Sequence, residues 1–228
     1  MEFSFHFSDD IEKYNESRLE INDSGIKRDE FYLSLTEFIR LLGNSFVIDL
    51  NKTYKSPILP KNLIHYTYNP LTKTWELFCD IQAFLSDIKA FNDETVFIKV
   101  GIPRLLIKYI FNETREHSYQ LTELFIYALK STESINEDTQ IYKFPFSNVN
   151  NAGRMCTGSN RLPKINALLE AENLHKNYLF QTVFTNHFYN ERNVSSYSLD
   201  KLLSKLQEQA FPQEWLIEQN MTFGEIIK

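Results

Sequence analysis

One stretch of small and turn-forming residues, PFSNVNNAGRMCTGSN, carries one of the two cysteines of the chain. This residue, Cys156, follows an apolar run and lies among asparagines and glycines. A nucleophilic cysteine must be reachable, and its thiolate is the reacting species. An irregular segment exposes such a thiol, but free cysteine is also among the most buried residue types. The residues alone therefore leave a reactive and a buried cysteine both open.

Two neighbours of Cys156 have side chains suited to acyl transfer. Asn148 offers an amide N–H, which stabilises the oxyanion formed when an amine attacks a thioester; loss of one such donor typically costs about 10²- to 10³-fold in rate. Gly153 takes a positive φ at little cost. Arg154 and Arg161 lie close enough in sequence to lower the pKa of a thiol, although the favoured interpretation is that they are solvent-facing charges.

Other common catalytic and nucleotide-binding motifs are not found in the sequence. It contains no GxxxxGK[ST], GxGxxG, HExxH or GxSxG motif. The two cysteines lie far apart, which fits neither a disulfide framework nor a zinc pattern, and we expect a reducing, cytoplasmic setting with no metal and no cofactor. His65 and His117 lie in hairpin regions and have no evident catalytic role.

Composition indicates a folded, acidic protein. The 228 residues are 43% hydrophobic and 14% aromatic, enough for one large domain over residues 1–228, with residues 1–30 as a strand and variable extension. The net charge of −6 disfavours nucleic acid as a partner. Residues 1–20 contain Glu2, Asp9, Asp10 and Glu12, so no signal peptide is expected, and no apolar run is long enough to cross a membrane.

Periodicity predicts an α+β domain built around an antiparallel meander. We expect a strand at residues 3–7, then a turn-rich region to about residue 30. A helix over 34–43 and a strand over 45–50 follow, and then an extended segment at 56–60. Residues 63–81 form one hairpin across NPLTKT, and residues 102–111 and 121–130 form another.

Two features of these elements are predicted in more detail. Trp75, Leu77 and Cys79 alternate along one strand, so we expect Cys79 to be buried. Helices are predicted over 165–174 and 198–209. Ser198 is the expected N-cap of the second, and its leucines share one face. Residues 177–190 are rich in aromatic side chains and remain ambiguous.

The active-site stretch resembles that of ubiquitin-conjugating enzymes. These carry, after a meander, His-Pro-Asn-aliphatic, then Gly, two residues and the catalytic Cys. The chain is more similar still to the PRTRC system protein B family, described as prokaryotic ubiquitin-conjugating-like family D. The similar segments, in order from about residue 60 to 215, are GIPRLLIKYIF, FIYALK, TQIYKFPFSNV, GRMCTGS, FTNHF and LLSKLQEQAFP.

The resemblance implies a ubiquitin-conjugating-like fold and a role for each matching residue. Cys156 matches the thioester-forming cysteine, Asn148 the oxyanion-stabilising asparagine, and Gly153 the turn glycine. His187, in FTNH, is a candidate imidazole donor, although this motif has one extra residue. The active-site loop also contains Thr157 and Gly158. Phe146 and Ser147 replace the His-Pro pair of ubiquitin-conjugating enzymes, and Phe146 is expected to fill the histidine's space.

Three functions follow as alternatives. The favoured one is a conjugating enzyme: an adenylating partner uses ATP to activate a ubiquitin-like protein, which passes to Cys156 as a thioester and then to an amine of an unknown acceptor. The second is a non-catalytic interaction module in a plasmid, mobile-element or antiphage-defence cassette, which the loss of His-Pro favours. The third, a nucleic-acid-binding plasmid protein, is disfavoured by the charge.

Overall fold

The computed structural model describes residues 2–6, 17–23, 26–33, 56–91, 95–116, 118–131, 134–189 and 193–228. The chain divides into two units, residues 1–56 and residues 57–228. The predicted helix over 34–43, the predicted strand over 45–50 and His117 lie outside the described residues. The single domain over residues 1–228 remains a prediction.

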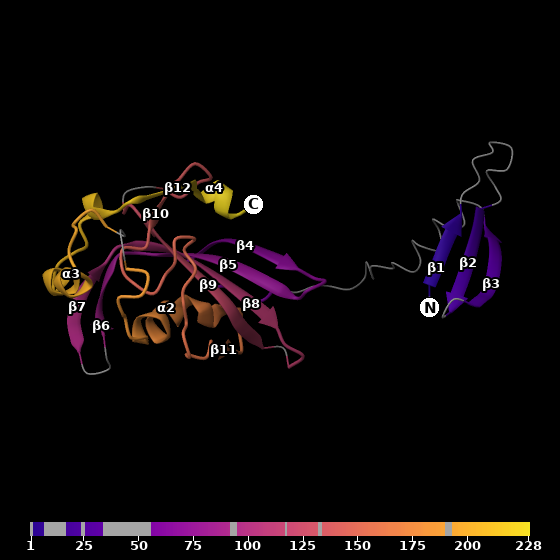
Figure 1. Ribbon diagram of the computed structural model, residues 1–228, viewed down its shortest axis with the longest axis horizontal. Helices are drawn as coiled ribbons and strands as arrows, with labels where there is room; N and C mark the ends of the chain where they lie inside the picture. The colour runs from indigo at the N-terminus through magenta and orange to yellow at the C-terminus, as the bar shows by residue number, and fades with distance from the viewer. Residues whose placement is uncertain are drawn as a thin grey trace. The chain divides into compact units, whose positions relative to one another are not determined.

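The first unit contains a three-stranded antiparallel sheet in the order β1-β2-β3 (Figure 1). Its strands are β1 (Glu2–His6), β2 (Ser17–Asp23) and β3 (Ile26–Leu33). The strand predicted at 3–7 is confirmed over residues 3–6, but the turn-rich interpretation is wrong over residues 17–23 and 26–30, which are strands. Residues 18–21 alternate polar and apolar types, a period-2 pattern that turn-forming residues on either side obscured.

The second unit is built on a curled antiparallel sheet with the strand order β12-β10-β9-β8-β5-β4, which β11 joins by pairing with β9 (Figure 1). These strands are β4 (Leu63–Asn69), β5 (Thr74–Ile81), β8 (Arg104–Glu113), β9 (Tyr119–Leu129), β10 (Gln140–Lys143), β11 (Lys164–Ile165) and β12 (Glu218–Thr222). Both predicted hairpins, β4–β5 and β8–β9, are confirmed.

A separate hairpin interrupts the meander between β5 and β8. It consists of β6 (Phe84–Lys89) and β7 (Val96–Ile102). The sequence interpretation joins the end of β7 to β8 as one strand beginning at residue 102. Pro103 separates the two, because proline has no N–H for a strand ladder. The order of strands in the sheet is unaffected, since β5 still pairs with β8.

Helical segments cover both faces of the sheet (Figure 1). They are 3₁₀ segments at Leu168–Asn173, Leu179–Gln181 and Gln213–Trp215, and α2 (Leu174–Asn177), α3 (Leu199–Leu206) and α4 (Phe223–Ile226). The helix predicted over 165–174 is therefore largely 3₁₀. The prediction for α3 is confirmed: its four leucines are buried and the Ser198 side chain accepts a hydrogen bond from the Lys201 N–H.

Strand alternation divides the interior into two cores. On one face Trp75, Leu77 and Cys79 pack toward α2 and α3, which confirms that these residues share a face and that Cys79 is buried. On the other, Phe78 packs against Phe223 of α4. Burial raises the pKa of the Cys79 thiol to about 12, so this cysteine stays protonated and unreactive.

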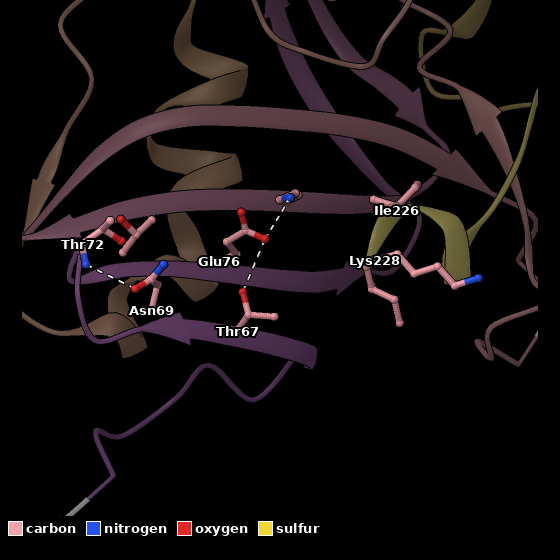
Figure 2. A pocket seen from close by; sticks show the side chains of 9 residues that line it. Thr67, Asn69, Thr72, Glu76, Ile226 and Lys228 are labelled. Carbon is pink, nitrogen blue, oxygen red and sulfur yellow. Dashed lines mark hydrogen bonds and ion pairs between the residues drawn. The ribbon is translucent and has the colours of Figure 1, made fainter. Parts of the chain in front are cut away.

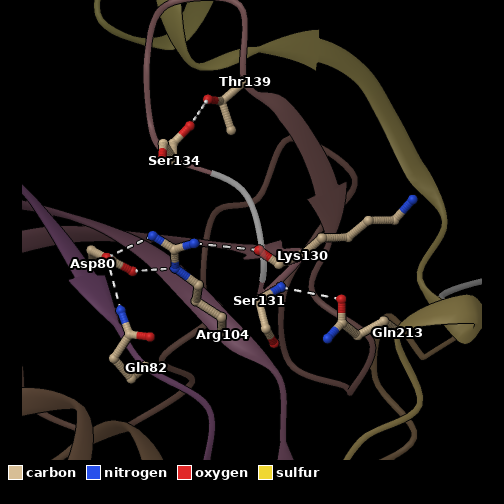
Figure 3. Close-up of polar contacts among 8 residues, drawn as sticks. All are labelled: Asp80, Gln82, Arg104, Lys130, Ser131, Ser134, Thr139 and Gln213. Carbon is tan, nitrogen blue, oxygen red and sulfur yellow. Dashed lines mark hydrogen bonds and ion pairs between the residues drawn. The ribbon is translucent and has the colours of Figure 1, made fainter.

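A buried ion pair ties β5 to β8 near the end of the sheet. Arg104 donates two hydrogen bonds of 2.8 Å to the carboxylate of Asp80, and a third of 3.4 Å to the carbonyl of Lys130 (Figure 3). Gln82 donates to the same carboxylate at 3.0 Å. The planar guanidinium matches a carboxylate in this two-point geometry, so it fixes the register of the two strands as well as the charge.

Candidate active site

Residues 148–156 form a short hairpin that ends at the cysteine. The Cys156 N–H donates to the Asn148 carbonyl at 2.7 Å, and the Asn150 N–H donates to the Arg154 carbonyl at 2.9 Å. Val149 and Met155 face each other across this hairpin as an antiparallel bridge. The two residues that the sequence predicted to act together, Asn148 and Cys156, are thus hydrogen-bonded through their backbones.

Strand β9 holds this hairpin on the sheet. The Met155 N–H donates to the Leu124 carbonyl and the Ile126 N–H to the Gly153 carbonyl, each at 2.8 Å. The same edge of β9 pairs with β11 on one side of the hairpin and with β10 on the other. The active-site segment therefore occupies the place of a strand in the sheet, although most of it has no regular secondary structure.

The tip of the hairpin depends on a glycine and an asparagine. The Asn150 side-chain oxygen accepts from the N–H groups of Ala152 and Arg154, at 2.9 and 3.0 Å. Gly153 has φ +84°, and a Cβ there would lie 2.3 Å from the Tyr127 ring. Tyr127 in turn donates to the Ala152 carbonyl at 2.9 Å. A side chain at position 153 would therefore displace either the tyrosine or the turn.

Asn148 is buried and has an unusual backbone conformation. Its φ is 63°, in the left-handed region that asparagine tolerates better than most residues. Its N–H donates to the His187 carbonyl at 2.9 Å. Its side-chain nitrogen donates to the Val183 carbonyl at 2.8 Å, and its oxygen accepts from the Thr185 hydroxyl at 3.1 Å. Asn148 thereby joins the cysteine hairpin to residues 183–187.

Cys156 itself is half-buried, between the buried Met155 and the exposed residues 158–160. Thr157 is half-buried and its carbonyl accepts from the Asn160 N–H at 2.9 Å. Gly158 is exposed with φ +55°, and a Cβ there would meet no atom within 4 Å. A thiol with partial access to solvent on a fixed backbone is the arrangement that nucleophilic chemistry requires.

Comparison with known proteins places the chain in a family. Residues 82–219, more than half of the chain, match prokaryotic E2 family D. The chain belongs to prokaryotic E2 family D. Comparison with curated proteins and with solved structures finds no match. This family D membership indicates a role like that of conjugating enzymes, and so implies interaction with a ubiquitin-like protein and an activating-type enzyme in general.

The two residues before Asn148 are buried in this family D protein. Phe146 has no exposed surface, and its ring centroid lies 5.4 Å from Phe144 and 5.9 Å from Phe211. Ser147 is also buried, and its hydroxyl has no hydrogen-bond partner among the described residues. Phe146 is thus part of a buried aromatic cluster, as expected of an apolar filler.

The remaining predicted residues lie at the surface of the family D domain. The structure brings the backbone of His187 to Asn148, but the His187 ring is exposed and stacks on Phe188 with centroids 3.8 Å apart. Arg154 is exposed and its Nε lies 3.3 Å from a Glu123 carboxylate oxygen. Arg161 is exposed as well. These positions agree with solvent-facing charges.

Sequence reasoning missed several residues that hold the site. Tyr127 and Gln219 each reach the hairpin tip, with Gln219 donating to the Asn151 carbonyl, and Thr185 reaches Asn148. Thr185 lies in the FTNH motif beside His187, so that motif was a signal for the segment but not for the residue. Tyr127 belongs to β9, which pairs with the hairpin, and Gln219 belongs to β12, which pairs with β10. Both residues lie far from the hairpin in sequence, by 25 and 68 residues from their partners.

A separate hollow of about 390 Å³ lies on the face of the sheet that packs against α4 (Figure 2). Its polar side chains include Thr67 and Lys108, which bind the Glu76 carboxylate at 3.4 and 3.0 Å. Cys156 does not line it. Among the described residues no group of three or more His, Cys, Asp or Glu side chains is placed to hold a metal ion. None of the described helices has the length and apolarity needed to span a membrane.

Proposed function

We propose that this family D protein is a conjugating enzyme that carries a ubiquitin-like protein on Cys156. The observation that supports this most is the hairpin of residues 148–156, which fixes Cys156 half-exposed and hydrogen-bonded to Asn148. A cysteine that only filled the core would need no such support, as Cys79 illustrates.

The reaction consists of two acyl transfers. The Cys156 thiolate attacks the thioester carbonyl of the ubiquitin-like protein on its activating enzyme; a new C–S bond forms and the activating enzyme leaves as a thiolate. An acceptor amine then attacks the same carbonyl carbon. A C–N bond forms, the C–S bond to Cys156 breaks, and the amine releases a proton. The partner enzyme uses the ATP, so this chain itself needs no metal or cofactor.

Asn148 is proposed to stabilise the oxyanion in the second transfer. A side-chain amide nitrogen carries two hydrogens, and one is donated to the Val183 carbonyl. The other is the proposed oxyanion donor, while Gly153 gives the turn that presents Cys156. His187 is retained as a candidate proton acceptor for the incoming amine, because its backbone is tied to Asn148 and its ring is exposed.

Several finer assignments go with this proposal. The protein has a ubiquitin-conjugating-like fold, belongs to the PRTRC system protein B family and acts in the cytoplasm. Its biological role is plasmid or mobile-element maintenance or antiphage defence.

One observation favours the alternative of a non-catalytic interaction module. Phe146 and Ser147 stand where ubiquitin-conjugating enzymes have His-Pro, so the motif supplies no imidazole beside Cys156. Both side chains are buried. In the enzyme interpretation this loss is tolerated because the phenylalanine keeps the hairpin supported by packing. In the module interpretation the fold is kept for binding, and Cys156 forms no thioester.

A non-reducing gel distinguishes these two functions. The chain is mixed with ATP and with the adenylating enzyme and ubiquitin-like protein encoded next to its gene. We expect a reductant-sensitive adduct that disappears in Cys156→Ala and persists in Cys79→Ala. The absence of any adduct, with an activating enzyme that forms its own thioester, would favour the module.

A further inference from the structure

We propose that Thr185 is a positioning residue for acyl transfer, because it fixes which way the side-chain amide of Asn148 points. This inference rests on the proposed function of Cys156 and Asn148. Thr185 lies 29 residues after Cys156 in the chain and reaches the site through hydrogen bonds to Asn148 and to the His187 N–H. It does not touch the reacting atoms; it acts through the asparagine.

Two backbone groups show which end of the Asn148 amide is the nitrogen and which is the oxygen. The Val183 carbonyl can only accept a hydrogen bond, so the amide nitrogen must face it, at 2.8 Å. The Thr185 N–H can only donate, so the amide oxygen must face that group, at 3.4 Å. A flipped amide would set oxygen against oxygen and N–H against N–H. The nitrogen of the amide therefore faces Val183 and its oxygen faces Thr185.

The Thr185 hydroxyl makes the shorter of the two hydrogen bonds from Thr185 to the Asn148 side-chain oxygen. It donates to the Asn148 oxygen at 3.1 Å, and it accepts from the His187 N–H at 3.2 Å. Without the hydroxyl, the amide oxygen keeps only the 3.4 Å contact with the Thr185 N–H, which is long for an N–H···O bond. The amide would then be held firmly only at its nitrogen, by the Val183 carbonyl, and it could tilt about that bond. The second N–H would no longer be held in one direction.

This hold matters for the proposed step because Asn148 is connected to the cysteine. The Asn148 carbonyl accepts the Cys156 N–H at 2.7 Å, so both residues move together. A donor aimed at a developing oxyanion is effective only when it is held in place beforehand. Misplacement of a catalytic group by about 1 Å can cost about 10²-fold. Loss of the hydroxyl should therefore slow acyl transfer while leaving thiol access unchanged.

Three variants separate positioning from general loosening of this segment. Thr185→Val removes the hydroxyl at nearly constant shape, and Thr185→Ser restores it. Thr182→Val is the matched control, since the Thr182 hydroxyl lies in the same segment and donates at 2.7 Å to the Leu179 carbonyl rather than to Asn148. The midpoint of urea unfolding is recorded for each variant, so that rates are compared only between folded proteins.

The test uses an acetyl group, which needs no partner protein. Cys156 is acetylated by exchange with a small acetyl thioester, the position is verified by peptide mass, and release to hydroxylamine is timed. S-acetyl-N-acetylcysteine has the same thioester without the protein and serves as the free thioester for comparison. We expect faster release from the wild type than from the free thioester, a loss of roughly 10- to 100-fold in Thr185→Val, and recovery in Thr185→Ser. Reaction of the free Cys156 thiol with iodoacetamide should be unchanged.

The possible failures are distinguishable. If the wild type releases acetyl faster than the free thioester, but Thr185→Val matches the wild type or Thr182→Val slows as much, the role of Thr185 is wrong and the proposed function stands. If the wild type is no faster than the free thioester, the proposed function is contradicted and the inference is overturned with it.

Discussion

The two cysteines of the chain lie in regions that are stabilised in different ways. Cys79 belongs to β5, where side chains alternate between two cores and the thiol has no exposed surface. Cys156 follows a hairpin without regular structure, which is fixed to β9 and to residues 183–187 by hydrogen bonds. One thiol is surrounded by apolar side chains; the other is held at the surface by its backbone.

This difference shows that side-chain burial decides the environment of one thiol and that backbone positioning decides the exposure of the other. Around Cys79, burial raises the thiol pKa to about 12, and packing is the only role left. Around Cys156, left-handed conformations at Asn148 and Gly153 allow the chain to turn and leave the thiol half-buried. Conformations of this kind have a local energetic cost that the contacts with β9 offset.

The largest expected effect is a difference in labelling between the two thiols. With iodoacetamide under native conditions, Cys156 should react more than about 10³-fold faster than Cys79, because Cys79 becomes accessible only when the sheet opens. Peptide mass spectrometry over time measures both rates, and the two should converge in unfolding concentrations of urea. Similar rates in the native protein would remove the distinction between the regions.

The next effect concerns the ion pair of the sheet. Arg104→Ala leaves the Asp80 carboxylate at a largely buried position without its guanidinium, and should lower the free energy of unfolding by about 3 to 5 kcal/mol. Lys99→Ala breaks the exposed pair with Glu208 and should cost less than about 1 kcal/mol. Urea unfolding measures both values. An equal cost for the two variants would show that burial does not set the strength of these pairs.

A smaller effect separates the two glycines beside Cys156. Gly153→Ala should cost about 2 to 4 kcal/mol, since its Cβ would meet the Tyr127 ring in addition to the strain of a positive φ. Gly158→Ala has a positive φ but open space, so about 1 kcal/mol is expected. Thermal unfolding compares them. A harmless Gly153→Ala would mean that the hairpin tip is not fixed against β9.

The smallest effect is a loss of stability in acid that comes from the core around Cys79. Burial lowers the pKa of His175 from 6.5 to about 4, with Lys176 adding to the shift. The unfolded chain therefore binds a proton first as the pH falls. The stabilisation is fully present above about pH 6.5 and decreases toward pH 4, by on the order of 2 kcal/mol. Urea unfolding from pH 7.5 to 4 should show this slope, and His175→Leu should lose it.

Regular periodicity made much of the sheet predictable. The alternation of Trp75, Leu77 and Cys79 and the leucine stripe of α3 each follow one local repeat, and the structure has both. Where a single residue interrupts a repeat, as Pro103 does between β7 and β8, the interpretation merged two strands. The helix predicted over 165–174 was mostly 3₁₀, because a helical pattern does not fix the hydrogen bonding of so short a segment.

The candidate site could be predicted only in its local part. Asn148, Gly153 and Cys156 lie within one stretch of sequence, so their spacing was visible. Their supports are not local: Tyr127 comes from β9, and Thr185 lies 37 residues beyond Asn148. Hydrogen bonds across such separations leave no periodic pattern in a single sequence, and so these residues emerged only from the fold.

The most direct test of the central claim is the chemical nature of the bond formed at Cys156. The wild type and Cys156→Ser are incubated with ATP, the activating enzyme and the ubiquitin-like protein, and the adducts are mapped by mass spectrometry. We predict an ATP-dependent adduct on Cys156 that thiols remove. In Cys156→Ser we predict either a thiol-resistant ester on the substituted hydroxyl or no adduct at all. An adduct mapped to Cys79 would contradict the account. So would a wild-type adduct that thiols do not remove.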